Sequence, residues 1–275
     1  MGQRITVVDA FTDTAYAGNP AAICVLGHPT TDEWMQAVAR EMRHSETAFC
    51  VPLDDGSFEL RWFTPRGEVR LCGHATLAAA HVLWEEGRLA LRETARFSTL
   101  SGELRAKPLG RQIELDFPAR SPSEVEAPIR LLEALGVVPS WTGRDTDDYV
   151  IVLESEGAVR ACSPDFRALG NIETRGAMIT ALADDDAIDF VSRFFAPRFG
   201  IDEDPATGSA QCSLTPLWAE RLQKQVLRAR QLSERGATFE AELVGSRVKL
   251  RGTCVTTLRG TLTDNPPIPT GILGR

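Results

Sequence analysis

Two stretches of the chain share a local pattern that decides its fold. Residues 63–84 read FTPRGEVRLCGHATLAAAHVLW, and residues 195–218 read FAPRFGIDEDPATGSAQCSLTPLW. Each stretch begins with Phe-x-Pro, reaches a Gly that follows Cys72 or Thr207, and continues into an apolar segment that ends at a Trp. Two matched features in the same order, each at the start of an apolar helix, predict a duplicated fold with one buried helix in each half.

The starts of these two predicted helices, at about 74–84 and 209–222, have the properties of ligand sites. A buried helix that follows a Gly has unpaired backbone N–H groups and the positive end of its dipole at its first turn. Such an end can hold an anion, for example a carboxylate. Two such ends that face each other would make a cleft for a small acid.

Short strand-like segments separated by turns surround both helices. We expect strands at 4–11, 20–26, 46–51, 58–63, 149–153, 176–183 and 187–195, with further strands up to about residue 262. Thr30 and Glu33 form a capping box that predicts an amphipathic helix through Met42. Glu46 therefore lies where a helix gives way to a strand.

The run at 116–129, DFPARSPSEVEAPI, is rich in Pro, Ser and charge and is the best candidate for a crossing between domains. We therefore predict domains at residues 1–118 and 119–275, with the option that the last strand returns to the first domain. A chain of 275 residues with 43% hydrophobic content is long enough for two cores.

Composition excludes several classes of partner. A formal net charge of -8 with scattered Lys and Arg disfavours nucleic acid. No apolar stretch approaches the length that crosses a bilayer, so we expect no membrane association and a cytoplasmic location. The six cysteines lie far apart, with no C-x-x-C pair and no His at metal-ligand spacing, so neither a zinc site nor a disulfide framework is indicated.

Four motifs carry a resemblance to a known family. They are VDAFTDTAYAGNPAAICVL at 8–26, AREMRHSETAFC at 39–50, FTPRGEVRLCGHATLAAAHVL at 63–83 and FFAPRFGIDEDPATGSAQCSLTPL at 194–217. In this order and spacing they resemble the successive motifs of PhzF-like proteins. The resemblance implies an α+β, diaminopimelate epimerase-like fold with two pseudo-symmetric domains. Each domain would have strands curled around a central helix, and the active site would lie between the domains. It also implies a homodimer that needs neither metal nor organic cofactor.

Glu46 is the acid/base that the resemblance implies. A carboxylate that removes a proton from carbon and returns it elsewhere must be partly desolvated and close to the substrate. The structural alternative is an exposed Glu, or one paired with the neighbouring Arg43. Because Glu46 opens an apolar strand, where a structural carboxylate would be costly, we favour catalysis.

The family resemblance places further polar groups in the same cleft. His74 and Asp204 are expected to hydrogen-bond the substrate and to help move the proton, although His74 could simply start its helix and Asp204 could shape the turn before Pro205. Substrate binding is assigned to four more residues, which are Ser45, Gly73, Gly208 and Ser209. The two glycines and Ser209 would supply backbone N–H groups, and the alternative for all three is helix capping, with which binding is compatible.

The role of Cys72 distinguishes two possible mechanisms, one with two thiols and one with a single base. Related racemases and epimerases of this fold use two thiols, one from each half, to move protons on opposite faces of the substrate. Thr207 stands where the second thiol would be, and Thr is far too weak an acid for that role. We therefore expect Cys72 to be a packed residue at the helix start and Glu46 to be the single base.

The sequence thus predicts a cofactor-independent isomerase that shifts a proton in a small unsaturated or amino-bearing carboxylic acid. The best-known family reaction isomerises 2,3-dihydro-3-hydroxyanthranilate, but the substrate of this chain is left open. Two alternatives remain: an amino-acid racemase or epimerase that uses Cys72, and a non-catalytic ligand-binding protein of the same fold.

Overall fold

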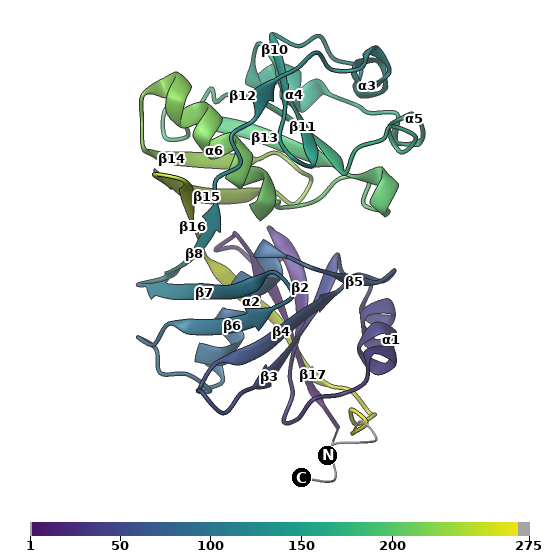
Figure 1. Ribbon diagram of the computed structural model, residues 1–275, viewed down its shortest axis with the longest axis vertical. Helices are drawn as coiled ribbons and strands as arrows, with labels where there is room; N and C mark the ends of the chain where they lie inside the picture. The colour runs from purple at the N-terminus through teal and green to yellow at the C-terminus, as the bar shows by residue number, and fades with distance from the viewer. Residues whose placement is uncertain (1, 269–275) are drawn as a thin grey trace. The chain divides into compact units, whose positions relative to one another are not determined.

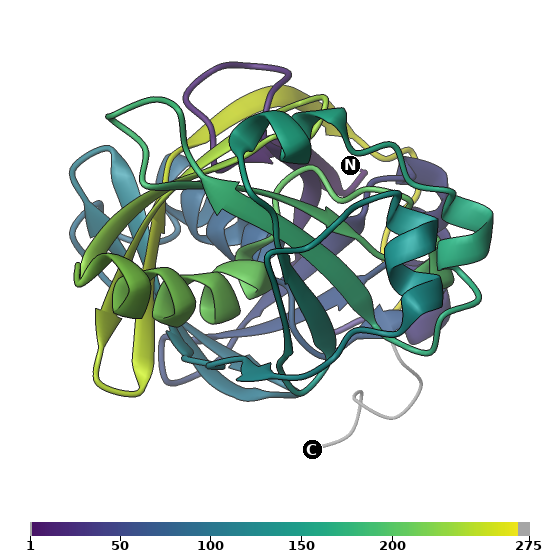
Figure 2. The same ribbon diagram turned by 90° about the horizontal axis from the view of Figure 1, so that it is seen from above.

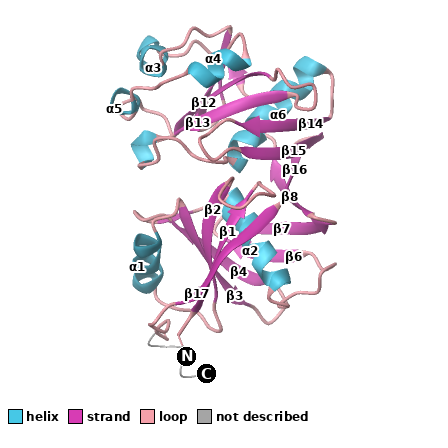
Figure 3. Cartoon of the chain, turned by 180° about the vertical axis from the view of Figure 1, so that it is seen from behind, coloured by secondary structure: helices cyan, strands magenta, loops and turns pink. Residues whose placement is uncertain are grey.

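The chain divides into two compact units in the computed structural model, which describes residues 2–268. One unit contains the residues up to Asp116 together with those from Gly252 onward, and the other is Phe117–Arg251. Strands outnumber helices in each unit (Figures 1 and 3). We predicted that residues 252–268 belong to the second domain, with the option that the last strand returns to the first. The structure groups these residues with the first unit.

The first unit is built from nine strands and two helices within the described residues. Its strands are β1 (Arg4–Ala10), β2 (Asn19–Val25), β3 (Glu46–Pro52), β4 (Phe58–Phe63), β5 (Glu68–Val69), β6 (Ala95–Thr99), β7 (Gly102–Leu109), β8 (Gln112–Pro118) and β17 (Cys254–Thr261). Its helices are α1 (Asp32–Met42) and α2 (Gly73–Glu85). The strand β17 pairs with β1, so the two ends of the described chain meet in one sheet.

The second unit repeats this arrangement. Its strands are β9 (Ser123–Glu124), β10 (Trp141–Arg144), β11 (Asp148–Val152), β12 (Gly176–Leu182), β13 (Phe190–Phe195), β14 (Val226–Gln231), β15 (Ala237–Val244) and β16 (Arg247–Gly252). Its helices are α3 (Ile129–Leu135), α4 (Glu156–Ala161), α5 (Phe166–Leu169), the 3₁₀ turn η1 (Pro197–Phe199) and α6 (Gly208–Leu222). The strand that we expected at 187–195 begins at Phe190, because Asp185 holds the preceding residues in a turn through the N–H groups of Ala187 and Ile188.

The order of strand pairings is the same in the two units. From β1, successive pairings are antiparallel to β2, parallel to β3, antiparallel to β4, parallel to β6 and antiparallel to β7. From β10, the pairings to β11, β12, β13, β14 and β15 follow the same sequence of directions. A parallel pair needs a crossover, and α2 and α6 occupy the corresponding crossovers. The duplicated fold expected from the two matched stretches is therefore present.

The helix α2 is the core element of the first unit. Ten of its 13 residues are buried, as expected from its apolar character on all sides. It contacts β1, β2, β3, β7 and β17, so strands surround it. Full burial of a side chain such as Leu77 or Leu83 contributes about 1.5 to 3 kcal/mol. This packing fixes the start of the helix, where the predicted site residues lie.

The helix α6 is the corresponding element of the second unit and is its longest helix, drawn in green in Figure 2. Eleven of its 15 residues are buried even though Pro216 lies inside it. Proline has no N–H to donate to the carbonyl four residues earlier, which belongs to Cys212. The backbone N–H of Arg120 donates to that carbonyl instead, at 2.8 Å. The predicted crossing segment, which contains Arg120, is thereby hydrogen-bonded to α6 at the carbonyl to which Pro216 cannot donate.

The cap of α1 differs from the expected one. Thr31, and not Thr30, is the N-cap, and its hydroxyl accepts a hydrogen bond from the N–H of Trp34 at 3.4 Å. The Thr30 hydroxyl donates to the carbonyl of Pro267 at 2.9 Å. The helix ends at Arg43, whose φ of 55° is left-handed, and β3 begins soon after at Glu46. Within the described residues, none of the helices has the length and apolar character to span a membrane.

Candidate active site

A set of three proton-exchanging side chains lies in the first unit. Glu46 is the first residue of β3, Cys72 is the N-cap of α2, and His74 is the second residue of that helix. His74 Nε2 lies 3.3 Å from Glu46 Oε2, and His74 Nδ1 lies 3.5 Å from Cys72 Sγ. The side chains of Glu46 and His74 are only 12% and 6% exposed. The sequence predictions for Glu46, His74 and Cys72 therefore meet in one place.

Local backbone structure explains why these three side chains converge. Glu46 is fixed by β3, which pairs in parallel with β2 so that Glu46 lies opposite Ala21. The extended backbone of Cys72 turns the chain into α2, and its carbonyl accepts from both the N–H and the hydroxyl of Thr76. The Cys72 side chain makes no capping bond and is left to face His74.

The imidazole of His74 is neutral in this environment. Burial, with a smaller effect from nearby His44, lowers the pKa of His74 to about 3. A neutral imidazole has one N–H, and the two contacts fit a single tautomer. Nε2–H donates to the Glu46 carboxylate, which can only accept when ionised, and Nδ1 accepts from the Cys72 thiol. The set can therefore hold and relay a proton.

A second polar cluster lies at the start of α6 in the second unit. The Thr207 hydroxyl donates to Asp204 Oδ2 at 2.5 Å. Buried Gln231 accepts from the Thr207 N–H at 2.8 Å and donates to the Asp204 carbonyl at 2.6 Å. Asp204 thus shapes the loop before the helix, as its structural alternative proposed. The role in substrate binding is compatible with these bonds, because a carboxylate has further acceptor positions.

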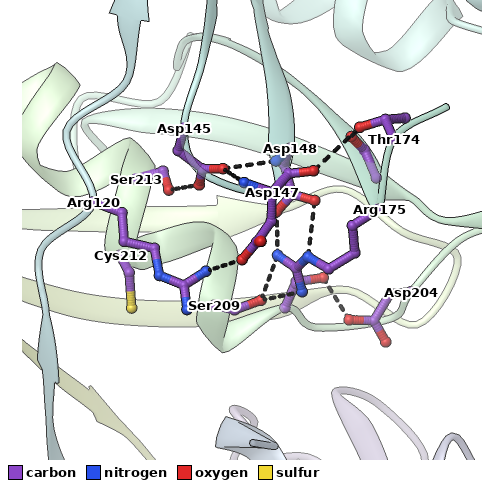
Figure 4. A network of polar contacts seen from close by, with 12 residues as sticks. Arg120, Asp145, Asp147, Asp148, Thr174, Arg175, Asp204, Ser209, Cys212 and Ser213 are labelled. Carbon is purple, nitrogen blue, oxygen red and sulfur yellow. Dashed lines mark hydrogen bonds and ion pairs between the residues drawn. The ribbon is translucent and has the colours of Figure 1, made fainter.

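Arg175 connects this helix start to a buried carboxylate (Figure 4). Its guanidinium donates to both oxygens of Asp148, in one case at 2.9 Å, and it lies 3.3 Å from the hydroxyl of Ser209. The Asp148 side chain is fully buried. Burial raises the pKa of Asp148 to about 6, although Arg175 acts against this shift. The pair places a positive group beside the first turn of α6.

The two clusters occupy matching places in the duplicated fold. Cys72 and Thr207 are the N-caps of α2 and α6, and neither side chain makes a capping bond. His74 and Ser209 are the second residues of those helices. Glu46 begins β3, and Gly176 begins the corresponding strand β12, with Arg175 immediately before it. The acidic side chain near the helix start of one unit and the cationic side chain near the helix start of the other therefore come from adjacent, not identical, positions of the repeat.

The predicted residues consequently fall into two groups. Glu46, Cys72 and His74 contact one another, with Ser45 preceding Glu46 and Gly73 beginning α2. Asp204, Gly208 and Ser209 belong to the second unit. Sequence reasoning missed Arg175, Asp148 and Gln231, which bind these residues or their neighbours. The available signal was the position of Arg175, which precedes a strand as His44 and Ser45 precede β3.

A cavity of about 330 Å³ lies elsewhere in the first unit. It is lined by the chain near Arg4, Gly27, His28, Arg88 and Pro266, and it contains none of the predicted site residues. Glu86 forms ion pairs with both of the arginines that line it. These contacts account for the charge of both arginines without a ligand, so the candidate residues remain those at the start of α2 and those at the start of α6, each in its own unit.

Comparisons with known proteins agree with this fold and with the motifs. The chain is 48% identical over 263 residues to an uncharacterized isomerase of Halalkalibacterium halodurans, covering 95% of this chain and 99% of that protein. A PhzF family crystal structure from Enterococcus faecalis matches with a TM-score of 0.90 and 38% identity, covering 95% and 99% of the two chains. A probable proline racemase from Agrobacterium radiobacter matches with a TM-score of 0.65 at 11% identity, covering 96% and 94%, which shows a shared fold alone.

These matches give the fold class and the family of the chain. The fold is the diaminopimelate epimerase-like α+β fold that racemases, epimerases and PhzF proteins share. Residues 8–260 match the model of the phenazine biosynthesis-like protein family. The chain belongs to that family and is an enzyme of the isomerase class.

Proposed function

We propose that the chain shifts a proton within a small unsaturated or amino-bearing carboxylic acid, with Glu46 as the acid/base. The contact between the Glu46 carboxylate and neutral His74, with both side chains nearly excluded from water, carries this proposal. A carboxylate in such surroundings is a stronger base than one in water, because water no longer stabilises its charge. The His74 N–H orients the carboxylate without adding a positive charge.

The reaction needs one group that accepts a proton and later returns it. Glu46 removes a proton from one carbon of the substrate, and the electron pair of that C–H bond becomes part of a shifted double bond. Protonated Glu46 then delivers the proton to another position of the same molecule. His74 Nε2–H can donate to the Glu46 side chain before and after it takes up the proton, because an oxygen of a carboxylic acid still accepts a hydrogen bond.

We assign substrate binding in the same reaction to polar groups of both units. Arg175 places a positive charge beside Ser209, at the first turn of α6, where backbone N–H groups are also available. These groups suit the carboxylate of an acid substrate. Asp204 and Gly208 on one helix, and Ser45 and Gly73 near Glu46, supply further hydrogen bonds. The expected homodimer, the cytoplasmic location and independence from cofactors stay predictions.

The test is mass spectrometry of small amino and hydroxy acids, including 2,3-dihydro-3-hydroxyanthranilate, incubated with the enzyme in heavy water. We expect deuterium uptake or double-bond migration with the native enzyme and none with Glu46→Gln. Glu59→Gln is a matched control, because Glu59 is also half-buried and lies on the neighbouring strand β4. Full activity of Glu46→Gln would exclude Glu46 as the base. No turnover of any compound by either protein would favour a ligand-binding protein.

The racemase alternative has one structural observation in its favour. Cys72 Sγ contacts His74, so a thiol and an imidazole lie together as they do where a thiol is activated. Thr207, at the equivalent position of α6, cannot act as the second thiol. We therefore keep Glu46 as the single base. Loss of activity on alkylation of Cys72, with Glu46→Gln still active, would reverse this choice.

A further inference from the structure

Glu46, Cys72 and His74 offer three different types of metal ligand at one point. A carboxylate oxygen, a thiol sulfur and an imidazole nitrogen of these residues all lie within 4.8 Å of one another. Among the described residues, they form the one group of three or more such side chains that could hold an ion. The spacing in the sequence did not indicate it, because Glu46 comes from a distant strand.

The distances approach those of a tetrahedral zinc site. With usual Zn–N, Zn–O and Zn–S bond lengths, the ligand atoms of a tetrahedron are separated by about 3.4 Å for N to O and about 3.6 Å for S to N. Glu46 Oε2 lies 3.3 Å from His74 Nε2. Cys72 Sγ lies 3.9 Å from the same nitrogen. The three ligand atoms all lie within 4.8 Å of one another, so a closing of the remaining gaps would bring them around one ion.

Burial and packing also favour a metal site. Cys72 and His74 are buried, with Cys72 only 6% exposed, and the core fixes the helix α2 that carries them. Binding of an ion would cost little side-chain entropy, because the three ligand side chains are already held in place.

We propose that Glu46, Cys72 and His74 bind one Zn²⁺ ion, which inhibits the enzyme by occupying the carboxylate of Glu46. The ion takes an oxygen of Glu46, Nε2 of His74 and the thiolate of Cys72, and water fills the fourth position. The proton on Nε2 moves to Nδ1, so the imidazole stays neutral. The Cys72 proton is released to solvent as the S–Zn bond forms. Inhibition rests on the proposed function of Glu46, whereas binding of the ion does not.

The experiment titrates the full-length, metal-free protein with Co²⁺, which reports on zinc sites by its absorption. We expect one Co²⁺ per chain, a thiolate-to-cobalt charge-transfer band in the near ultraviolet, and displacement by one equivalent of Zn²⁺ with release of a proton. Cys72→Ser should abolish the band. His74→Gln and Glu46→Gln should weaken binding by more than the roughly 10- to 100-fold that loss of an outer-shell partner costs.

A matched control is Cys162→Ser. The Cys162 thiol is also 6% exposed, and it donates to the carbonyl of Leu135, a bond that a hydroxyl can make. This variant should bind Co²⁺ as the native protein does. If Cys72→Ser does not fold, protection of Cys72 from alkylation by Zn²⁺, mapped by mass spectrometry, replaces it. Absence of a charge-transfer band, an unchanged band in Cys72→Ser, or no protection of Cys72 would each overturn the proposal. Substrate is not needed, so failure here is distinct from failure of the proposed function.

Discussion

Arg175 contacts Ser209 in the second unit as Glu46 contacts His74 in the first. Glu46 is the first residue of β3 and Arg175 immediately precedes the corresponding strand β12, and each approaches the second residue of the buried helix in its own unit. The backbone pattern is shared, but one pair carries a negative group and the other a positive one. The duplicated fold therefore supplies the proposed base from one copy and the proposed anion-binding group from the other.

The charge and geometry of Arg175 should determine affinity for an acid substrate. Arg175→Lys keeps the positive charge but loses the planar guanidinium that reaches Asp148 and Ser209 together. We expect KM to rise by about 10- to 100-fold for the substrate that the heavy-water experiment identifies, with kcat changed far less. Steady-state kinetics measure both constants.

Arg193→Lys is the matched control for that experiment. Arg193 forms a two-bond ion pair with Glu203 and lies over the ring of Phe195, as Arg175 does with Asp148 and the ring of Phe194. It should lose similar stability without the change in KM. An equal rise in KM for the two variants would show that Arg175 acts only through stability.

Asp148 should make stability depend on pH. Its pKa in the folded protein is raised from 3.8 to about 6, so the folded state holds its proton more tightly than the unfolded state does. The resulting stabilisation is present below about pH 3.8 and is lost as the pH rises through about 6, with a maximum of about 3 kcal/mol. Urea denaturation at about pH 4.5 and about pH 7.5 measures the change.

The comparison for Asp148 is Asp148→Asn, which cannot titrate. Other carboxyls act in the opposite direction, because hydrogen bonds to Arg61 and to the N–H of Asp184 lower the pKa values of Asp32 and Glu156. The readout is therefore the difference between native protein and variant at each pH. The free energy of unfolding of the native protein should fall relative to the variant as the pH rises. Parallel curves would contradict the raised pKa.

Cys72→Ser should remain active in proton transfer. If Glu46 is the single base, removal of the thiol changes only a neighbour of His74, and deuterium incorporation should fall by less than about tenfold. Glu46→Gln should lower it by at least about a thousandfold, because the acid/base itself is lost. Rates of deuterium uptake by mass spectrometry compare the two variants. A larger loss in Cys72→Ser than in Glu46→Gln would favour the thiol mechanism.

Gly176 leaves room for the ring beneath Arg175. A Cβ on Gly176 would lie 2.4 Å from the Phe194 ring, which is itself buried and lies 5.5 Å from the Arg175 guanidinium. Gly176→Ala should lower the free energy of unfolding by about 1 to 3 kcal/mol through overpacking. Thermal unfolding measures the effect. Gly27→Ala, where no atom lies within 4 Å of the added carbon, should leave stability nearly unchanged.

The resemblance to the PhzF-like motifs, and not local pattern alone, predicted roles for Glu46 and His74. Local pattern predicted the strand that begins at Glu46 and the buried helix that begins near His74. The repeat of pattern in the two halves predicted the duplicated fold. These features depend on neighbours in the sequence, so they can be recognised without a structure.

The second cluster depends on contacts that local sequence does not specify. Arg175 before a strand resembles any surface charge, and only the fold places buried Asp148 against it. The cap of α1 illustrates the same limit. Thr30 and Thr31 both fit the helix start, and the choice between them is settled by a bond from Thr30 to Pro267, at the other end of the described chain.

The return of β17 to β1 has a consequence for synthesis on the ribosome. The second unit is continuous, so all of it has been made while the nascent chain still lacks residues 254–261. Until that strand emerges, β1 has an open edge that can pair with other chains. We expect the second unit to fold first during translation and the first unit, with its proposed base, to be completed last.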